Sequence, residues 1–198
     1  GGILVFNLPG LSQEGSHTRV YDNDVYENNI ENFATEGTTV SVVPSGSGVL
    51  IMANDRVEIF DNRIRDNQSA NVVIASSYTV DIGVDDETFD GYPEGIYIHD
   101  NELSGGGDAP DSILLALQAI LFGGQEGSLP SIVWDGALDE AKLVDGLPLD
   151  EDRICVQEQG AEVLNADAPN SFAQPVIETA AVDCELDRLD PVELANAS

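Results

Sequence analysis

A phrase that recurs three times at one interval constrains the fold of this chain more than any other feature. It reads "TRVYDNDVYENN" from Thr18, "VEIFDNRIRDNQ" from Val57 and "IYIHDNELSGGG" from Ile96, and each copy begins 39 residues after the one before. Self-similarity at a fixed period is typical of proteins whose successive units stack and bury their apolar faces on one another. The repeat therefore predicts stacked units with equivalent positions side by side.

Each copy alternates apolar and polar residues, which is the pattern of a half-buried β-strand. The apolar side carries Val20, Ile59 and Ile98 at equivalent positions. On the polar side, stacking would place opposite charges next to each other, as neighbouring strands favour. The predicted pairs are Arg19 with Glu58, and Arg63 with both Asp24 and Glu102.

Short apolar runs also lie before and between the copies, at 3–6, 40–43, 49–52 and 72–75. They are bounded by Gly, Ser, Pro and Asn, so they indicate buried strands rather than helices. Each repeat is therefore expected to contain at least one strand besides those of the recurring phrase.

The segment "GVLIMANDRVEIFDNRIRDN" at 48–67 follows an apolar run with two strands that each end near an Asn. In this pattern the chain resembles the right-handed parallel β-helix repeat of the pectate-lyase-like solenoid superfamily, over roughly residues 2–106. The resemblance implies an all-β, right-handed parallel β-helix (solenoid) with a short α-helix and a C-terminal capping segment, as the C-terminal portion of such a protein. It also implies a row of stacked turn residues, with a partial second row: Asn23, Asn62 and Asn101, then Asn28 and Asn67.

Asn suits this position for two reasons. It is tolerated in the left-handed backbone conformation, and its amide can bond to the Asn above and the Asn below. The acidic residues that precede these Asn residues are expected on the solvent side of the turn rather than in a catalytic row. They are Asp22, Asp61 and Asp100.

Past Gly107 the period is lost. We expect one continuous domain in three parts: irregular coils at 1–107, a helix at 108–124, and the last strands, cap and disulfide-held tail at 125–198. The run "DAPDSILLALQAILFGG" predicts the helix, with Asp111 or Ser112 as its N-cap and a Gly at its end. "SIVWDGAL" and "RICVQEQGAEVLNAD" predict further strands.

The two cysteines, Cys155 and Cys184, have no His nearby, which favours a disulfide over a metal site. A disulfide would place the protein outside the cytosol. We therefore expect a secreted, cell-surface or periplasmic protein.

The chain has 37 acidic residues and only seven Lys and Arg, for a formal net charge of −30. Such a surface repels nucleic acid and anionic membranes, so neither is expected as a partner. The longest apolar run, at 113–122, is shorter than the roughly 20 residues that a membrane span requires. The charge is typical of solubility in high salt, and a specific role in cation binding is the alternative.

Calcium is the one candidate cofactor, because the loop "DIGVDDETFDGYPEG" crowds carboxylates, which Ca²⁺ accepts as ligands. Its spacing matches no EF-hand or nonapeptide motif, and in a chain this acidic such clusters also arise by chance. The candidate metal ligands are Asp81, Asp85, Asp86 and Asp90.

His99 and Asp100 are the candidate catalytic residues, since a His titrates in the range that acid–base work requires. However, His99 is in register with two aromatic residues, so a stacked planar side chain explains it equally well. The planar side chains form a candidate ligand-binding stripe, which suits stacking on sugar rings or packing beneath a loop. They are Tyr21, Phe60, Tyr97 and His99.

Two functions remain open at this point, and the first is favoured. It is a non-catalytic scaffold, adhesive or glycan-binding module, with polysaccharide as a ligand, or with self-association into an oligomer or filament through the uncovered N-terminal strand at 3–6. The alternative is a calcium-assisted polysaccharide lyase or epimerase. An enzyme of that kind requires an Arg or His that is free of structural partners and faces the acidic loop.

Overall fold

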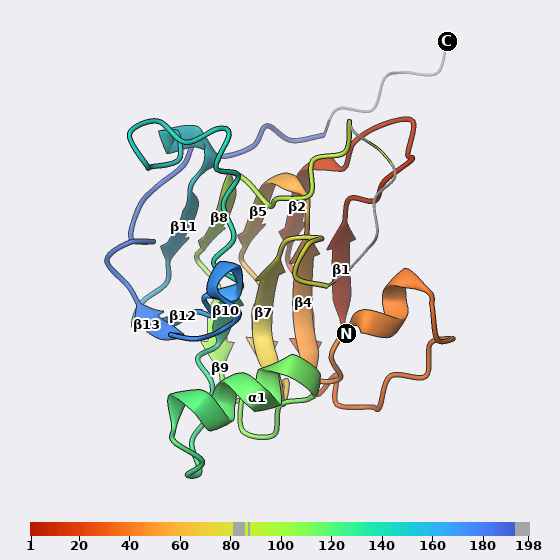
Figure 1. The fold of residues 1–198 in the computed structure, drawn as a ribbon, viewed down its shortest axis with the longest axis vertical. Helices are drawn as coiled ribbons and strands as arrows, with labels where there is room; N and C mark the ends of the chain where they lie inside the picture. The colour runs from red at the N-terminus through yellow and green to blue at the C-terminus, as the bar shows by residue number, and fades with distance from the viewer. Residues whose placement is uncertain (81–85, 87, 193–198) are drawn as a thin grey trace.

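The strands of the protein divide among three sheets, and up to β12 consecutive strands along the chain lie in different sheets (Figure 1). The computed structural model describes residues 1–80, 86 and 88–192. Within each sheet, neighbouring strands are three places apart in chain order over the repeat region. The chain therefore visits all three sheets before it returns to the first.

The largest sheet has six strands in the order β1-β4-β7-β10-β12-β13. The first five run parallel, and β13 pairs antiparallel with β12. The strands are β1 (Ile3–Phe6), β4 (Ser47–Met52), β7 (Ala70–Ala75), β10 (Ile132–Trp134), β12 (Val163–Asn165) and β13 (Val176–Glu178).

The two smaller sheets are parallel throughout. The four-stranded sheet has the order β11-β8-β5-β2, and the three-stranded sheet has the order β3-β6-β9. Their strands are β2 (Ser16–Tyr21), β5 (Asp55–Phe60), β8 (Ile96–His99), β11 (Ile154–Gln157), β3 (Asp24–Tyr26), β6 (Arg63–Arg65) and β9 (Glu102–Ser104).

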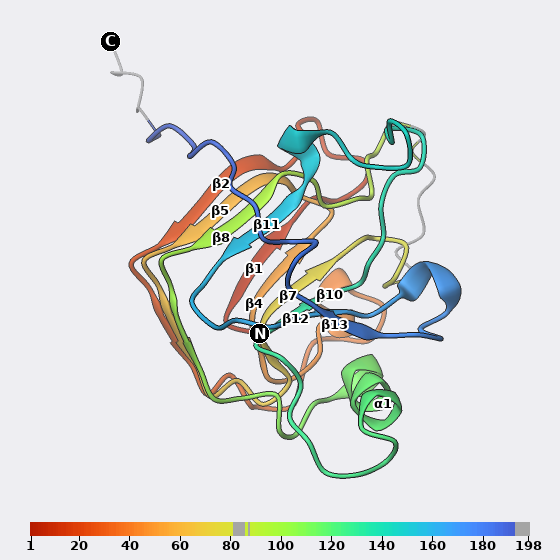
Figure 2. The same ribbon diagram turned by 90° about the vertical axis from the view of Figure 1, so that its left-hand side faces the viewer.

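One α-helix, α1 (Ser112–Leu121), lies against the largest sheet (Figure 2). Its N-cap is Asp111, whose side chain accepts a hydrogen bond from the backbone N–H of Ser112, so this predicted helix start is confirmed. No helix of the described residues is long and apolar enough to cross a membrane. The described part of the chain also contains three short 3₁₀ helices: η1 (Thr39–Val42), η2 (Asp150–Asp152) and η3 (Ala168–Asn170).

The core has two parts, one on each face of the largest sheet. Between the three sheets lie closely packed Val and Ile side chains, among them Ile51, Ile59 and Ile98. On the other face, Leu114 and Leu117 of α1 pack against the sheet and bury a second apolar cluster. The alternation of side chains along each strand assigns them to the two faces.

The fold class predicted from the sequence is wrong. The strands do not form a single all-β, right-handed parallel β-helix; they form a six-stranded, mostly parallel sheet and two smaller parallel sheets, and α1 adds a helical layer. The arrangement is an α/β-type sandwich. The 39-residue repeat predicts only the register between strands of the two smaller sheets. Both α1 and the antiparallel strand β13 lie outside the repeat.

The predicted register between the three copies is confirmed. Strand β2 pairs with β5 so that Thr18 lies beside Val57, and β5 pairs with β8 so that Val57 lies beside Ile96. The predicted charge pairs also form. Arg19 Nε is 3.2 Å from Glu58 Oε2, and Arg63 lies 3.0 Å from Glu102 and 4.0 Å from Asp24.

The turn asparagines stack in two rows. In the first, Asn23 Nδ2 donates to Asn62 Oδ1 and Asn62 Nδ2 donates to Asn101 Oδ1, both at 2.9 Å. In the second, Asn28 Nδ2 donates to Asn67 Oδ1 at 3.0 Å. The amide of Asn62 also donates to two backbone carbonyls, so this buried side chain ties two turns together.

The left-handed residue in these turns is not the Asn but the Asp before it. Asp22, Asp61 and Asp100 have φ of 57°, 53° and 54°, and all three are exposed on the solvent side as expected. Asp is one of the few residue types that tolerate this conformation. The Asp therefore makes the turn, and the Asn that follows links it to the next strand.

We predict that Asn62→Ala lowers the free energy of unfolding by about 2–4 kcal/mol, because it leaves buried backbone groups without partners. Asn23→Ala is the matched control, since Asn23 lies at the end of the row; its loss should be about 1 kcal/mol. Urea denaturation followed by circular dichroism measures both values. Equal losses in the two variants would contradict the central role of Asn62.

Candidate functional site

The outer face of the four-stranded sheet carries buried ionisable side chains. Glu58 of β5 is 1% exposed and His99 of β8 is 2% exposed. Both occupy positions that point away from the apolar core, because they alternate along their strands with core residues. Burial of such groups is costly unless each is hydrogen-bonded, so their partners define the site.

Glu58 and His99 belong to one chain of contacts. Glu58 Oε1 is 3.1 Å from His99 Nε2, and His99 Nδ1 is 2.9 Å from Asp100 Oδ2. Arg19 Nε donates to the second oxygen of Glu58 at 3.2 Å. The hydrogen bond from His99, assisted by Arg188, lowers the pKa of Asp100 below its usual value. The candidate catalytic pair of His99 and Asp100 thus lies between the carboxylate of Glu58 and the guanidinium of Arg188.

The candidate ligand-binding stripe is brought together, but most of it is covered. Phe60 stacks between Tyr21 and His99, with ring centroids 5.1 Å and 5.5 Å apart, and Tyr97 lies 4.2 Å from His99. Phe60, Tyr97 and His99 are buried, whereas Tyr21 is 47% exposed. Only Tyr21 therefore offers a substantial ring surface to a ligand in this structure.

The C-terminal segment covers this face. Cys184 forms a disulfide with Cys155 of β11, as predicted. Beyond it, Arg188 Nη2 donates to Asp100 at 2.9 Å and the Leu189 N–H donates to Glu58 Oε2 at 3.2 Å. Between the segment and the sheet lies a groove of about 740 Å³.

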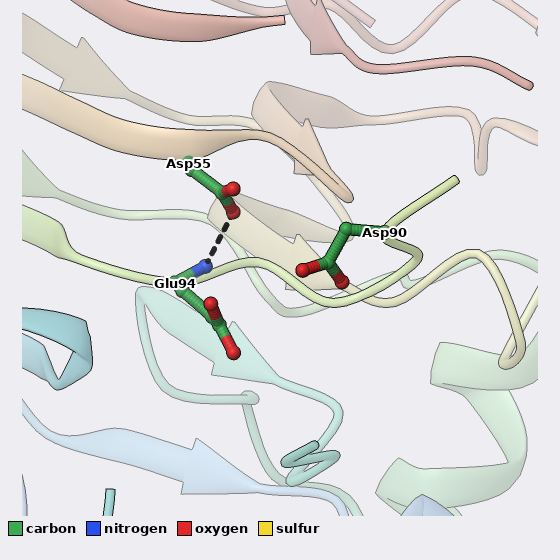
Figure 3. A group of neighbouring side chains, drawn as sticks. All are labelled: Asp55, Asp90 and Glu94. Atoms are coloured by element: carbon green, nitrogen blue, oxygen red, sulfur yellow. Dashed lines mark hydrogen bonds between the residues drawn. The ribbon is translucent and has the colours of Figure 1, made fainter. Parts of the chain in front are cut away.

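A separate carboxylate cluster lies where β5 begins and where the chain approaches β8. It consists of Asp55, Asp90 and Glu94, and one oxygen of each lies within 4.8 Å of the others (Figure 3). The Glu94 N–H donates to Asp55 Oδ1 at 3.3 Å. Lys142 binds the other two carboxylates, at 2.6 Å from Glu94 Oε2. The three oxygens have the chemistry of a hard-cation site, and the ammonium of Lys142 contacts two of the three groups.

This cluster differs from the predicted metal site. Asp81 and Asp85 lie outside the described residues, so their part of the prediction is untested. Asp86 accepts hydrogen bonds from the Gly10 N–H and from Thr88, and it does not belong to the group that contains Asp90. Sequence reasoning missed Asp55 and Glu94. Their separation of 39 residues, the period of the repeat, was the available signal.

At one end of the three sheets, the outer sides of β1, β2 and β3 form what we call the open edge. Each of these strands has a neighbour on one side only among the described residues. The Asn rows also end here. Among the described residues, no donor reaches Asn23 Oδ1 or Asn28 Oδ1. The side-chain oxygens of the later Asn residues in both rows accept hydrogen bonds.

Exposed apolar side chains collect in the chain that forms this edge. The segment between β3 and β4 lies beyond β1 (Figure 1), and it exposes Phe33 by 93% and Ile30 by 77%. The further exposed members between residues 11 and 42 are Leu11, Tyr21, Tyr26, Val40 and Val42. A concentration of exposed large apolar side chains in one part of the chain is a candidate interaction site.

The far end of the Asn row is closed by contrast. Both the N–H and the side-chain amide of Asn101 donate to the carboxylate of Glu158, at 2.6–3.1 Å. Burial raises the pKa of Glu158. The largest sheet also ends in the antiparallel strand β13. The two ends of the stacked strands are therefore chemically different.

No protein-family model matches the chain, and no curated protein or solved structure matches it either. The candidate sites consequently rest on their own geometry.

We predict that Asp55→Asn stabilises the protein relative to the parent as the pH rises from 4 to 7. Burial and the charges of Asp90 and Glu94 raise the pKa of Asp55 from 3.8 to about 7. Between these values the unfolded chain loses the proton while the folded chain keeps it, so the parent loses stability as the pH rises. The variant has no such loss, and thermal melting should show a gap that widens up to about pH 7 and then stays constant.

Asp86→Asn serves as the control of opposite sign. Hydrogen bonds from Thr88 and Gly10 lower the pKa of Asp86, so the ionised group stabilises the folded chain above the usual pKa of Asp. This variant should melt below the parent at neutral pH and approach it as the pH falls. A pH-independent gap for Asp55→Asn would contradict the assigned burial of its charge.

Proposed function

We propose that the chain is a non-catalytic scaffold module of a secreted, cell-surface or periplasmic protein, and that it associates with a second copy through the open edge. The open edge carries this proposal. Among the described residues, it combines strands that have a neighbour on one side only, two amide oxygens that no donor reaches, and exposed apolar side chains. Edges of this kind pair with other chains unless they are blunted or covered.

An edge-to-edge pair is the mode that the hydrogen bonding favours. The open strands of a second copy offer backbone N–H groups, which the oxygens of Asn23 and Asn28 require. Repeated head-to-tail stacking into a filament is less favoured, because Glu158 already binds Asn101 at the far end of the first Asn row and the antiparallel β13 borders the largest sheet there. A contact that uses the same surface on both copies closes after two subunits.

The location outside the cytosol is supported by the disulfide between Cys155 and Cys184, since such bonds persist in oxidising compartments. The charge of −30 limits nonspecific contact with other polyanions. Association must overcome the same charge, so added salt should strengthen it.

The lyase or epimerase alternative requires a Lys, Arg or His side chain that is free to act on a substrate. Lys142 and the six Arg side chains each contact an acidic or carbonyl group. His99 lies beneath the C-terminal segment between Glu58 and Asp100. The scaffold proposal needs no such free group.

We predict that the weight-average mass of the parent protein rises from one towards two chains as its concentration increases, and that Ile30→Lys/Phe33→Lys stays monomeric. The lysines would replace apolar contact area with charges that resist burial. Light scattering across a concentration series in 0.5 M salt measures both proteins; that concentration is about three times physiological ionic strength.

Leu147→Lys is the matched control, since Leu147 is exposed but lies in the loop before η2, away from the edge strands. It should associate as the parent does. A parent protein that remains monomeric throughout the series would overturn the proposal, and so would an equal effect of the control.

A further inference from the structure

The C-terminal segment that covers the four-stranded sheet has an unusual form of attachment. We call residues 185–192 the strap. The strap begins after Cys184, has no helix or strand, and crosses from β11 towards β8 and β5 (Figures 1 and 2). Only its first end is fixed covalently.

Two polar contacts hold the rest of the strap among the described residues. The Arg188 guanidinium donates to Asp100, and the Leu189 N–H donates to Glu58. Arg188 and Asp100 have side chains that are 63% and 59% exposed, and ion pairs in such positions contribute little to stability. Leu186 and Leu189 are half-buried, so the apolar hold is also partial. The strap is therefore weakly attached compared with the sheet beneath it.

The surface beneath the strap presents a buried hydrogen-bond acceptor, Glu58, to the main chain of the strap. Glu58 is a fully buried carboxylate that receives hydrogen bonds from Arg19 on its own sheet, but one of its donors is the main chain of the strap. If this face only had to be covered by the strap, an apolar residue at position 58 would be more stable, because a buried charge is costly when one of its hydrogen-bond donors leaves. The groove of about 740 Å³ beside Glu58 provides room along the strap.

The charge around the groove selects the sign of the ligand. Apart from the strap itself, its lining carries the carboxylates of Glu58, Asp150 and Glu151 and the guanidinium of Arg56, which is paired with Glu151 and Asp152. The strap places its one cationic side chain, Arg188, against Asp100. A rim of this sign attracts cations and repels anions.

We propose that this groove is a binding site for an extended peptide that carries an Arg followed by an apolar residue, and that the strap is its built-in competitor. The strap shows the binding mode: a guanidinium on Asp100, the next main-chain N–H on Glu58, and an apolar side chain towards the sheet. A peptide from a partner would displace Arg188 and Leu189 and make the same contacts. The site is independent of the open edge.

The test uses the full chain and a fluorescein-labelled peptide with the sequence of residues 186–190, "LDRLD". The variant Arg188→Ala/Leu189→Pro removes both strap contacts, since Pro has no N–H to donate. We expect the variant to bind the peptide at least tenfold more tightly than the parent chain by fluorescence anisotropy. The control Val192→Ala changes an exposed strap residue that does not line the groove, and it should bind as the parent does.

Changes in the peptide test its chemistry. Replacement of its Arg by Ala should weaken binding to the variant at least tenfold, and replacement of both its Asp residues by Ala should strengthen it. Equal affinity of parent and variant, or equal binding of the peptide without Arg, would overturn the proposal and leave the strap as a structural cover.

A second measurement uses the unmodified chain and does not depend on the stability of the variant. Amide hydrogen exchange should be faster in residues 185–192 than in β11, and 1 mM peptide should accelerate exchange in the strap as it is displaced. Exchange in the strap that is as slow as in β11, or that is unchanged by the peptide, would equally contradict the proposal.

Discussion

The hydrogen bonds of one side-chain amide, that of Asn62, are the interaction on which the arrangement of the sheets depends. This amide is linked to Asn23 in the turn before it and to Asn101 in the turn after it. It also donates to the carbonyl of Val20 before the first of these turns and to that of Phe60 before its own turn. Parallel strands need such links at their ends, because their connections are long and do not fix register locally. The left-handed Asp61 makes the turn tight enough for the amide to reach. Register, charge pairing and the Asp55–Glu94 contact all follow from this spacing.

The sequence predicted the local features because they repeat or because they have a short-range cause. The register of β2, β5 and β8 follows from the 39-residue interval, and the start of α1 follows from the capping residue Asp111. The fold class was wrong because its decisive features lie outside the repeat. Strand β13 has exposed residues and no apolar pattern, and its antiparallel pairing with β12 arises from a turn that no motif marks. The amphipathic α1 was identified, but its role as a layer on the largest sheet depends on tertiary packing.

The candidate sites show the same division. The stacking of Tyr21, Phe60 and His99 was visible in the register. The cover over this face comes from a distant segment, whose Arg188 and Leu189 contact Asp100 and Glu58, and no repeated pattern marks it. The Asp55–Glu94 pair was one period apart and accessible to sequence reasoning. Lys142, which completes that cluster, comes from a loop with no repeated pattern. The sequence did not single out this carboxylate cluster, because acidic clusters are common by chance in a chain with 37 acidic residues.

The disulfide acquires a meaning beyond stability when its position is considered. Cys155 lies in the strand at the border of the polar sheet face, and Cys184 is the residue directly before the strap. The bond therefore keeps the strap at a high effective concentration over the groove, whatever the concentration of the protein itself. A competitor from solution must exceed that local concentration. In a reducing environment the tether would lengthen, and the same groove would become accessible to weaker ligands, so the oxidation state of one bond sets the threshold for entry.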